Sequence, residues 1–116
     1  MPISNGQVPN TSILQLIANP QKFDKKTVRF QGVVNIEFER NGIYLSKEHW
    51  ENSVTSCGIW LDIDPKLAKS RKWANGKYFI IEGVFHAEDK GHMGLWMGSI
   101  SNITLLQVHE VVTPQK

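Results

Sequence analysis

The architecture of this chain is specified most clearly by the residues Thr27-Val-Arg-Phe-Gln-Gly-Val-Val-Asn-Ile-Glu-Phe-Glu39, in which polar and apolar side chains alternate. Alternation with a period of two over this length predicts a β-strand with one buried face. The buried face is expected to carry Val28, Phe30, Gly32, Val34, Ile36 and Phe38. A glycine on that face indicates a sharp bend, a bulge or a close approach of another strand.

The same arrangement recurs in Lys77-Tyr-Phe-Ile-Ile-Glu-Gly-Val-Phe-His86, where Gly83 takes the place of Gly32. Phe79, Ile81, Gly83 and Phe85 fall on its inner face. Two long strands, each bent at a glycine, predict a small closed barrel of the kind that serves as a binding scaffold.

Composition fits one globular domain. The chain has 116 residues, 41% of them hydrophobic, and a formal net charge of +2, which neither identifies nor excludes a polyanion binder. Cys57 is the single cysteine, so an internal disulfide and a cysteine zinc cluster are both excluded. The first ten residues lack a basic n-region and an apolar run, and no long apolar segment follows, so we expect a cytoplasmic protein without a membrane partner. If a signal sequence had been removed, a secreted or periplasmic location would fit equally.

Local signals predict a short helix followed by five strands. Ser12 and Gln15 have the spacing of a capping box, and Asn19-Pro20 ends the helix that they begin. Asn41-Gly42 is a strong hairpin signal after the first strand. The strands are expected over residues 27–39, 43–45, 58–63, 77–86 and 95–106.

A second helix is expected between the third and fourth strands. Asp64-Pro65 begins it, it runs to Trp73, and Asn75-Gly76 closes it. In the fifth strand the apolar phase slips near Ser101-Asn102, which predicts a bulge. We expect a flexible N-terminus over residues 1–10, one domain over 11–109 and a frayed tail over 110–116.

Three strands, a helix and two further strands, with bends in strands one and four, is the element order of a five-stranded OB-fold barrel. An SH3-like or other small barrel is the alternative, and such barrels normally lack the helix between strands three and four. The fold class is therefore mainly β, an OB-fold-like barrel preceded by an N-terminal helix.

Several motifs resemble those of small bacterial OB-fold proteins whose role is largely uncharacterised. They are the helix end Leu14-Gln-Leu-Ile-Ala-Asn-Pro20, the strand Phe23-Asp-Lys-Lys-Thr-Val-Arg-Phe-Gln-Gly32, and the shorter runs Ile43-Tyr-Leu45, Asn75-Gly-Lys-Tyr-Phe-Ile-Ile-Glu-Gly83 and Gly91-His-Met-Gly94. The resemblance extends from Thr11 to Leu106. It implies the barrel fold, and it implies no particular activity or cofactor.

Alternation also assigns a candidate binding surface. If Ile43 and Ile59 face inward, then Tyr44 and Trp60 face outward on strands two and three, the surface on which OB-folds bind oligonucleotides and oligosaccharides. The cations that could contact phosphate there are Arg29, Arg40, Lys66, Lys69, Arg71 and Lys72. The alternatives are that the aromatic side chains pack under the N-terminal helix or in a dimer contact, and that the helix cations form a solvated face.

The turn Asp89-Lys-Gly-His-Met-Gly94 is the second candidate, because its glycines allow His92 and Met93 to project from a tight turn. In the favoured alternative, His92 hydrogen-bonds to the backbone and fixes the turn. A metal site from His86, Asp89 and His92 lacks any recognised ligand spacing, so no metal or cofactor is expected. No serine, nor Cys57, shows the neighbours of a catalytic nucleophile, and no enzymatic activity is expected.

Three hypotheses for the function remain. The first is a non-catalytic module that recognises another protein, as an inhibitor, immunity or assembly factor, with a homodimer as a further possibility. Tryptophan, methionine and arginine are enriched at such surfaces, and the chain has four tryptophans, among them Trp60 and Trp96. The second is binding of single-stranded nucleic acid or a nucleotide through strands two and three. The third is a small hydrolase or metal enzyme. The mixed charges favour the first.

Overall fold

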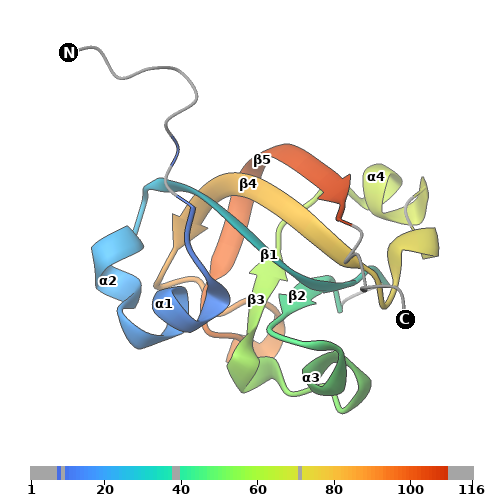
Figure 1. Cartoon of the computed structure of the whole chain (residues 1–116), viewed down its shortest axis with the longest axis horizontal. Coiled ribbons are helices and arrows are strands. Elements are labelled where there is room, and N and C mark those ends of the chain that lie inside the picture. Colours follow the sequence, from blue (N-terminus) through green and yellow to red (C-terminus); the bar gives the residue numbers. More distant parts are fainter. Residues whose placement is uncertain (1–7, 9, 38–39, 71, 110–116) are drawn as a thin grey trace, which may run out of the picture.

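The computed structural model describes residues 8, 10–37, 40–70 and 72–109, and these form a closed five-stranded β-barrel (Figure 1). Neighbouring strands follow the order β1-β2-β3-β5-β4, and β4 pairs with β1 to close the ring. The β3–β5 pair is parallel and the other pairs are antiparallel. The strands are β1 (Thr27–Asn35), β2 (Gly42–Tyr44), β3 (Gly58–Leu61), β4 (Tyr78–His86) and β5 (Ser99–Val108). The predicted OB-fold-like barrel is therefore confirmed.

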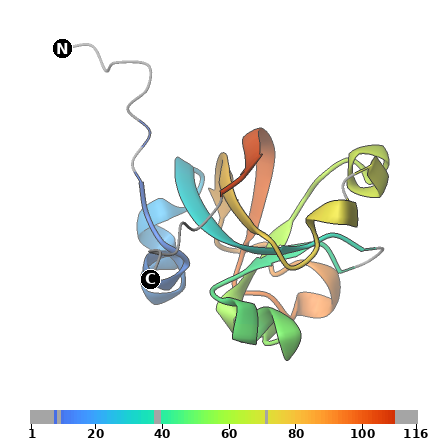
Figure 2. The same cartoon turned by 45° about the vertical axis from the view of Figure 1, so that its right-hand side comes forward.

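Short helices connect and cover the strands. They are α1 (Ile13–Ala18), α2 (Pro20–Phe23), α3 (Lys47–Glu51), α4 (Pro65–Ser70) and the 3-10 turns η1 (Thr55–Cys57), η2 (Lys72–Ala74) and η3 (His92–Gly94). The pair α1 and α2 lies at one end of the barrel, and α4 with η2 lies at the opposite end (Figures 1 and 2). Among the described ranges, no helix has the length and apolar content needed to cross a bilayer.

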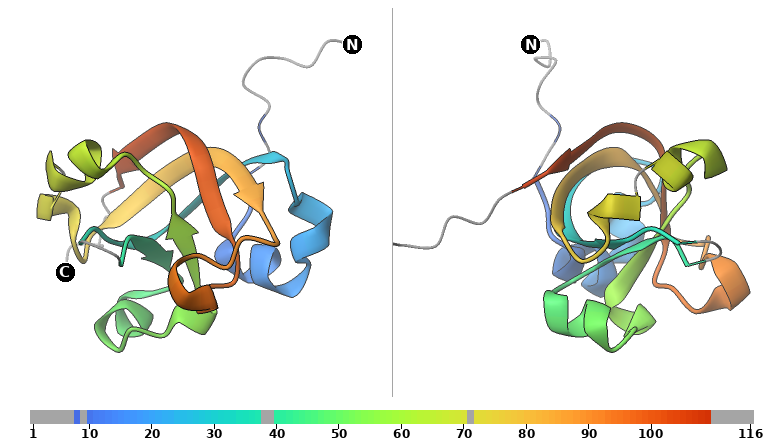
Figure 3. Two further views of the ribbon diagram at one scale, coloured as in Figure 1. Left: turned by 180° about the vertical axis from the view of Figure 1, so that it is seen from behind. Right: turned by 90° about the vertical axis from the view of Figure 1, so that its right-hand side faces the viewer.

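The two bent strands behave as their glycines predict. Gly32 and Gly83 are both buried, and β1, β4 and β5 curl around one apolar core (Figure 3). A Cβ on Gly32 would lie 2.5 Å from the carbonyl oxygen of Tyr44, and one on Gly83 would lie 2.7 Å from that of Ser101. The absent side chains let neighbouring backbone approach closely, which permits the bend.

The predicted bulge in the fifth strand is also confirmed. Pairing between β4 and β5 changes register between Glu82 and Val84, and Asn102 adopts a φ of +48° on the opposite strand. The short polar side chain of asparagine tolerates this left-handed conformation better than most residues do.

Several predicted boundaries are wrong. The first strand ends at Asn35, the third at Leu61, and the fifth begins at Ser99 instead of residue 95. Residues 95–98 belong to a long connection in which Trp96 and Met97 pack against the barrel while Leu95 is exposed, so their hydrophobicity does not come from a strand.

The two predicted helices also differ in detail. Ser12 caps α1 by accepting from the Gln15 amide at 3.1 Å, as expected. Pro20 ends α1 but also begins α2, a role that proline's fixed φ allows at a first helical position. The second helix is split into α4 and η2, with Gly76 closing the segment at a φ of +80°.

The predicted terminal segments and parts of the first turn fall mainly outside the described residues. Phe38, Glu39, Arg71 and the tail over 110–116 lie outside them, as do residues 1–7 and 9. Asn10 is described, and it forms a parallel bridge with Arg29.

Candidate functional site

The connection between β4 and β5, residues 87–98, folds over the outer surface of β2 and β3 and creates the most distinctive part of the molecule. Trp96 is its anchor, with only 4% of its surface exposed. It fits because Gly42 and Gly58 beneath it carry no side chain: a Cβ on either would collide with its six-membered ring. Backbone hydrogen bonds from Trp60 N–H to Gly98 and from Met97 N–H to Gly58 fasten the connection to β3.

This cover corrects the predicted position of Tyr44. Its side chain is 2% exposed instead of facing solvent, and its ring lies 5.4 Å from that of Trp96. All three residues of β2 are buried, since the barrel core covers one face of the strand and the connection covers the other. Trp96, predicted as a partner contact, is likewise a packing residue.

Trp60 is half-buried and remains at the surface. The His92 ring stacks near it, with centroids 6.2 Å apart and planes 25° from parallel, while Trp96 meets it edge-on at 5.8 Å. Gly91, with a φ of +69°, permits this approach, because a Cβ there would lie 2.7 Å from Trp60. The expectation that two outward aromatic residues share this surface therefore holds for Trp60 alone.

His92 does not fix the turn by hydrogen bonding, contrary to the favoured interpretation. Its ring is exposed and has no hydrogen-bond partner among the described residues. The turn is held by Asp89 instead, since one of its carboxylate oxygens accepts from the Gly91 N–H at 3.1 Å and the other from the Ser99 hydroxyl at 2.9 Å. The imidazole is therefore left available beside Trp60.

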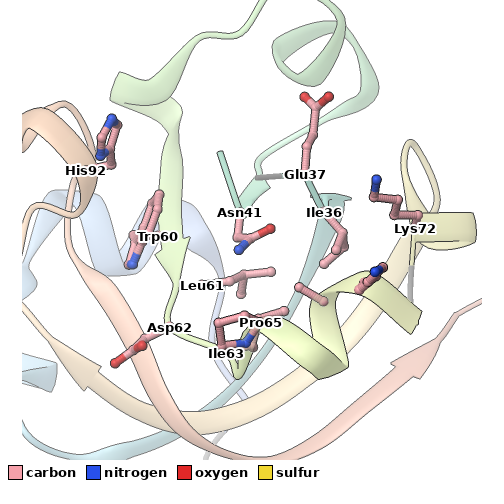
Figure 4. A pocket seen from close by; sticks show the side chains of 12 residues that line it. Ile36, Glu37, Asn41, Trp60, Leu61, Asp62, Ile63, Pro65, Lys72 and His92 are labelled. Atoms are coloured by element: carbon pink, nitrogen blue, oxygen red, sulfur yellow. The ribbon is translucent and has the colours of Figure 1, made fainter. Parts of the chain in front are cut away.

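A pocket of about 500 Å³, here called pocket A, opens beside Trp60 and His92 (Figure 4). Figure 4 shows these two rings on one side and Ile36, Glu37 and Lys72 on the other, with Ile63 and Pro65 below. The described residues that line it are Ile36, Glu37, Asn41, Trp60, Leu61, Asp62, Ile63, Pro65, Ala68, Lys69, Lys72 and His92. The volume is in the range of pockets that hold small ligands or anchoring side chains.

Asn41 supplies the polar feature of pocket A. Its side chain points into the space between Trp60 and Ile36 (Figure 4). Its Oδ1 atom is buried and has no hydrogen-bond partner among the described residues. A buried acceptor without a donor is unfavourable, so this atom favours a ligand that brings an N–H or O–H group.

A second hollow of about 390 Å³, pocket B, lies on the other side of His92. Its described lining residues are Arg40, Ser53, Thr55, His92, Met93, Leu95 and Trp96. Arg40 Nη2 donates to Ser53 Oγ at 3.0 Å, which holds the guanidinium at the rim. Because His92 lines both pockets, pocket A, pocket B and the residues between them form one surface, here called the binding face.

Exposed apolar residues add to the binding face. Met93 and Leu95 expose 77% and 55% of their surface. They make up two of the five large apolar side chains that are strongly exposed in the described ranges, the others being Leu14, Trp73 and Val108. Met93 also holds a φ of +61°, which is costly for a residue with a side chain. Strained backbone and exposed apolar side chains are both typical of contact surfaces.

The remaining predicted site residues divide clearly. Arg40, Trp60, Lys69, His92 and Met93 line the two pockets, and the buried Trp96 forms part of the wall of pocket B. Lys66 lies on α4 outside both linings, and Arg71 lies outside the described residues.

Arg29 lies elsewhere, on the closing seam of the barrel. Its guanidinium donates to Glu82 Oε1 at 2.7 Å, the single ion pair found among the described residues. The hydrogen bond from Arg29 lowers the pKa of the Glu82 carboxyl. Arg29 is thus engaged in holding β1 to β4, away from the binding face.

Sequence reasoning does not find Asn41, Ile36 and Pro65 as pocket residues. It places Asn41 in a turn and Pro65 at a helix start, and both assignments are compatible with a second role. No periodicity or spacing links these positions, because the pocket forms from three separate segments.

The possible catalytic and metal-binding groups are used structurally. His86 Nε2 lies 2.7 Å from Ser101 Oγ, and Ser46 caps α3 while its Oγ lies 2.6 Å from His49 Nδ1. Within the described part of the chain, no three histidine, cysteine, aspartate or glutamate side chains are grouped closely enough to hold a metal ion.

Comparisons with known proteins give no match: no protein-family model, no curated protein and no solved structure resembles this chain significantly. The resemblance to small bacterial OB-fold proteins stays a prediction from the motifs, and function has to be argued from the binding face.

Proposed function

We propose that this chain is a non-catalytic binding module that recognises a protein partner through the binding face, in an inhibitor, immunity or assembly-type role. The observation that carries the proposal is that exposed Met93 and Leu95 line pocket B, which shares His92 with the largely apolar pocket A. Protein interfaces combine an apolar centre with a polar rim, and methionine and aromatic residues are enriched in them.

The arrangement of the face matches that anatomy. Leu61, Ile63 and Pro65 provide an apolar interior for pocket A, which an anchoring side chain of a partner would fill. Glu37 and Asp62 lie at its rim together with Lys69 and Lys72. Mixed charges of this kind select a partner by complementarity and do not attract polyanions in general.

Single-stranded nucleic acid is less well supported. Stacking of successive bases requires several outward aromatic rings and a continuous positive groove. The burial of Tyr44 removes one of the two predicted rings, and Glu37 and Asp62 interrupt the positive charge beside Trp60.

A pull-down with the full chain as bait tests the proposal. The bait variant Met93→Asn/Leu95→Ser removes the exposed apolar tip, and asparagine tolerates the φ at position 93. Leu14→Ser, on α1, is the matched control, because Leu14 is 61% exposed and lies outside both pockets. We expect the wild type and the control to capture one protein in a stoichiometric amount. The double variant should capture at least tenfold less of that protein.

Two results would contradict the proposal. One is equal retention of the partner by the double variant. The other is strong tryptophan quenching by oligonucleotides that weakens steeply with salt, which would indicate nucleic-acid binding instead.

A further inference from the structure

We infer that the partner segment bound by this face is an acidic peptide, with a carboxylate that pairs with Arg40 in pocket B and a neighbouring apolar side chain that enters pocket A. This inference rests on the proposed function, since it names the chemistry of the partner at the same face.

The charges of pocket B favour binding of a carboxylate. Its described lining contains a guanidinium, an imidazole and two hydroxyl groups, and no carboxylate. Arg40 is exposed and forms no ion pair among the described residues. One of its five N–H donors goes to Ser53, which leaves donors for the paired hydrogen bonds that a carboxylate accepts.

Pocket A carries the second step. Its apolar interior suits an aliphatic or aromatic side chain, while Asn41 Oδ1, which has no hydrogen-bond partner in the described part of the chain, favours a donor. A peptide backbone supplies an N–H group at every residue except proline, so one segment can satisfy both demands. Lys69 and Lys72 lie at the rim of pocket A together with Glu37 and Asp62, so the charge that selects an acidic residue is that of pocket B.

The position of His92 joins the two pockets. Because His92 lines both of them, a ligand that fills pockets A and B at once crosses the imidazole and its stacked partner Trp60. An extended peptide chain is narrow enough to cross there and places successive side chains on opposite sides of its backbone.

Backbone strain supports pocket B as a place of contact. Of the four described non-glycine residues with positive φ, Ser53 and Met93 both line pocket B. Strained conformations of this kind concentrate at binding sites, where the surrounding structure keeps them in place.

Selection of phage-displayed random peptides on the immobilised full chain tests the inference. We expect enriched peptides to contain aspartate or glutamate within a few residues of a large apolar residue. A synthetic copy of the most enriched peptide is then titrated against variants. Arg40→Gln should lower the affinity for this peptide at least about fivefold, the loss expected when one charge-assisted hydrogen bond disappears. Lys26→Gln, an exposed cation on the turn before β1, is the control and should leave affinity unchanged.

The outcomes separate this inference from the proposed function. Enrichment of neutral or basic peptides, equal binding by Arg40→Gln, or failure to enrich any peptide would each overturn the acidic peptide. If Met93→Asn/Leu95→Ser still loses the protein captured in the pull-down, the proposed function survives that failure. If the double variant retains it, both proposals fall.

Discussion

Gly32 shows how strongly one residue can constrain this barrel. A Cβ at this position would lie 2.5 Å from the Tyr44 carbonyl oxygen and within 3 Å of Ile43 and Ile13. Backbone cannot yield as a flexible side chain can, so we expect Gly32→Ala to lower the free energy of unfolding by about 2–3 kcal/mol. Urea denaturation followed by circular dichroism measures this loss.

Gly94→Ala is the control for that substitution. Among the residues that the structure describes, nothing lies within 4 Å of the position of its Cβ, so the cost of the substitution comes from the φ of +65° and should be about 1 kcal/mol. Equal losses for the two variants would show that steric contact at Gly32 is not what the barrel depends on.

A second prediction for a single residue concerns the hydroxyl of Tyr44. Burial raises the pKa of its hydroxyl, the Arg40 charge opposes this shift and the Glu37 charge adds to it. The folded state therefore holds its proton to higher pH than the unfolded state does. The free energy of unfolding should fall as pH rises above about 10, the ordinary tyrosine value, and Tyr44→Phe should lack this part of the decline.

Urea titrations between pH 8 and 11 measure both chains. All other titratable groups are common to both proteins, so the informative quantity is the difference between the two curves. A difference that stays constant with pH would show that the Tyr44 hydroxyl ionises as readily in the folded state as in the unfolded one.

At the scale of elements, the sequence predicts strands and their order well because each strand carries its own local signals. The alternation around Gly32 and Gly83 correctly places both glycines inward. Alternation states which side chains share a face, but not what covers the other face. The burial of Tyr44 and Trp96 depends on residues 87–98 folding over β2, a contact between distant segments that no local pattern contains.

The binding face is predictable only in part for the same reason. Trp60, His92 and Arg40 can be singled out by residue type and by their expected positions on or beside the surface that OB-folds use for binding. Asn41 cannot, because the property that matters is an Oδ1 atom that finds no partner among the described residues, and that depends on the surrounding backbone.

Asp89 holds the connection that bears His92 and Met93. Its carboxylate accepts from the Gly91 N–H and from the hydroxyl of Ser99, which is fully buried. Asp89→Ala leaves that hydroxyl without its acceptor, so we expect the free energy of unfolding to fall by about 1–3 kcal/mol. Amide hydrogen exchange should also accelerate between residues 90 and 98, and mass spectrometry of proteolytic fragments would detect it.

Glu88→Ala is the matched control, because Glu88 is the exposed neighbour and, within the described ranges, its carboxylate accepts only from the Gln21 side chain. It should change stability by less than about 0.5 kcal/mol and leave exchange in the connection unaltered. Unchanged exchange in Asp89→Ala would mean that Trp96 and the backbone hydrogen bonds to β3 anchor the segment without Asp89.

In the molecule as a whole, the residues that close the barrel lie apart from the residues proposed to bind a partner. The β1–β4 seam closes the barrel through the longest run of paired residues that β1 makes, and Arg29 and Glu82 face each other across it. The binding face lies on β3 and the connections beside it, so its exposed residues can be changed without opening the seam. This separation is why Met93, Leu95 and Arg40 are suitable positions for testing function.

The seam itself should give the barrel a dependence on acid pH. Hydrogen bonds from Arg29 and Thr104 lower the pKa of Glu82 below its unfolded value, so the folded state favours the ionised carboxylate. That contribution is fully present above the unfolded pKa of about 4.5 and is lost as pH falls through the lowered folded value. Glu82→Gln should therefore be less stable than the wild type at pH 7, and the free energies of unfolding of the two proteins should converge as the pH falls below about 4.

Urea titrations from pH 7 to 2.5 measure this convergence, with Glu88→Gln as a control whose stability curve should run parallel to that of the wild type. A Glu82→Gln curve that also runs parallel would mean that the pair contributes through geometry alone and that closure of the barrel does not depend on this charge.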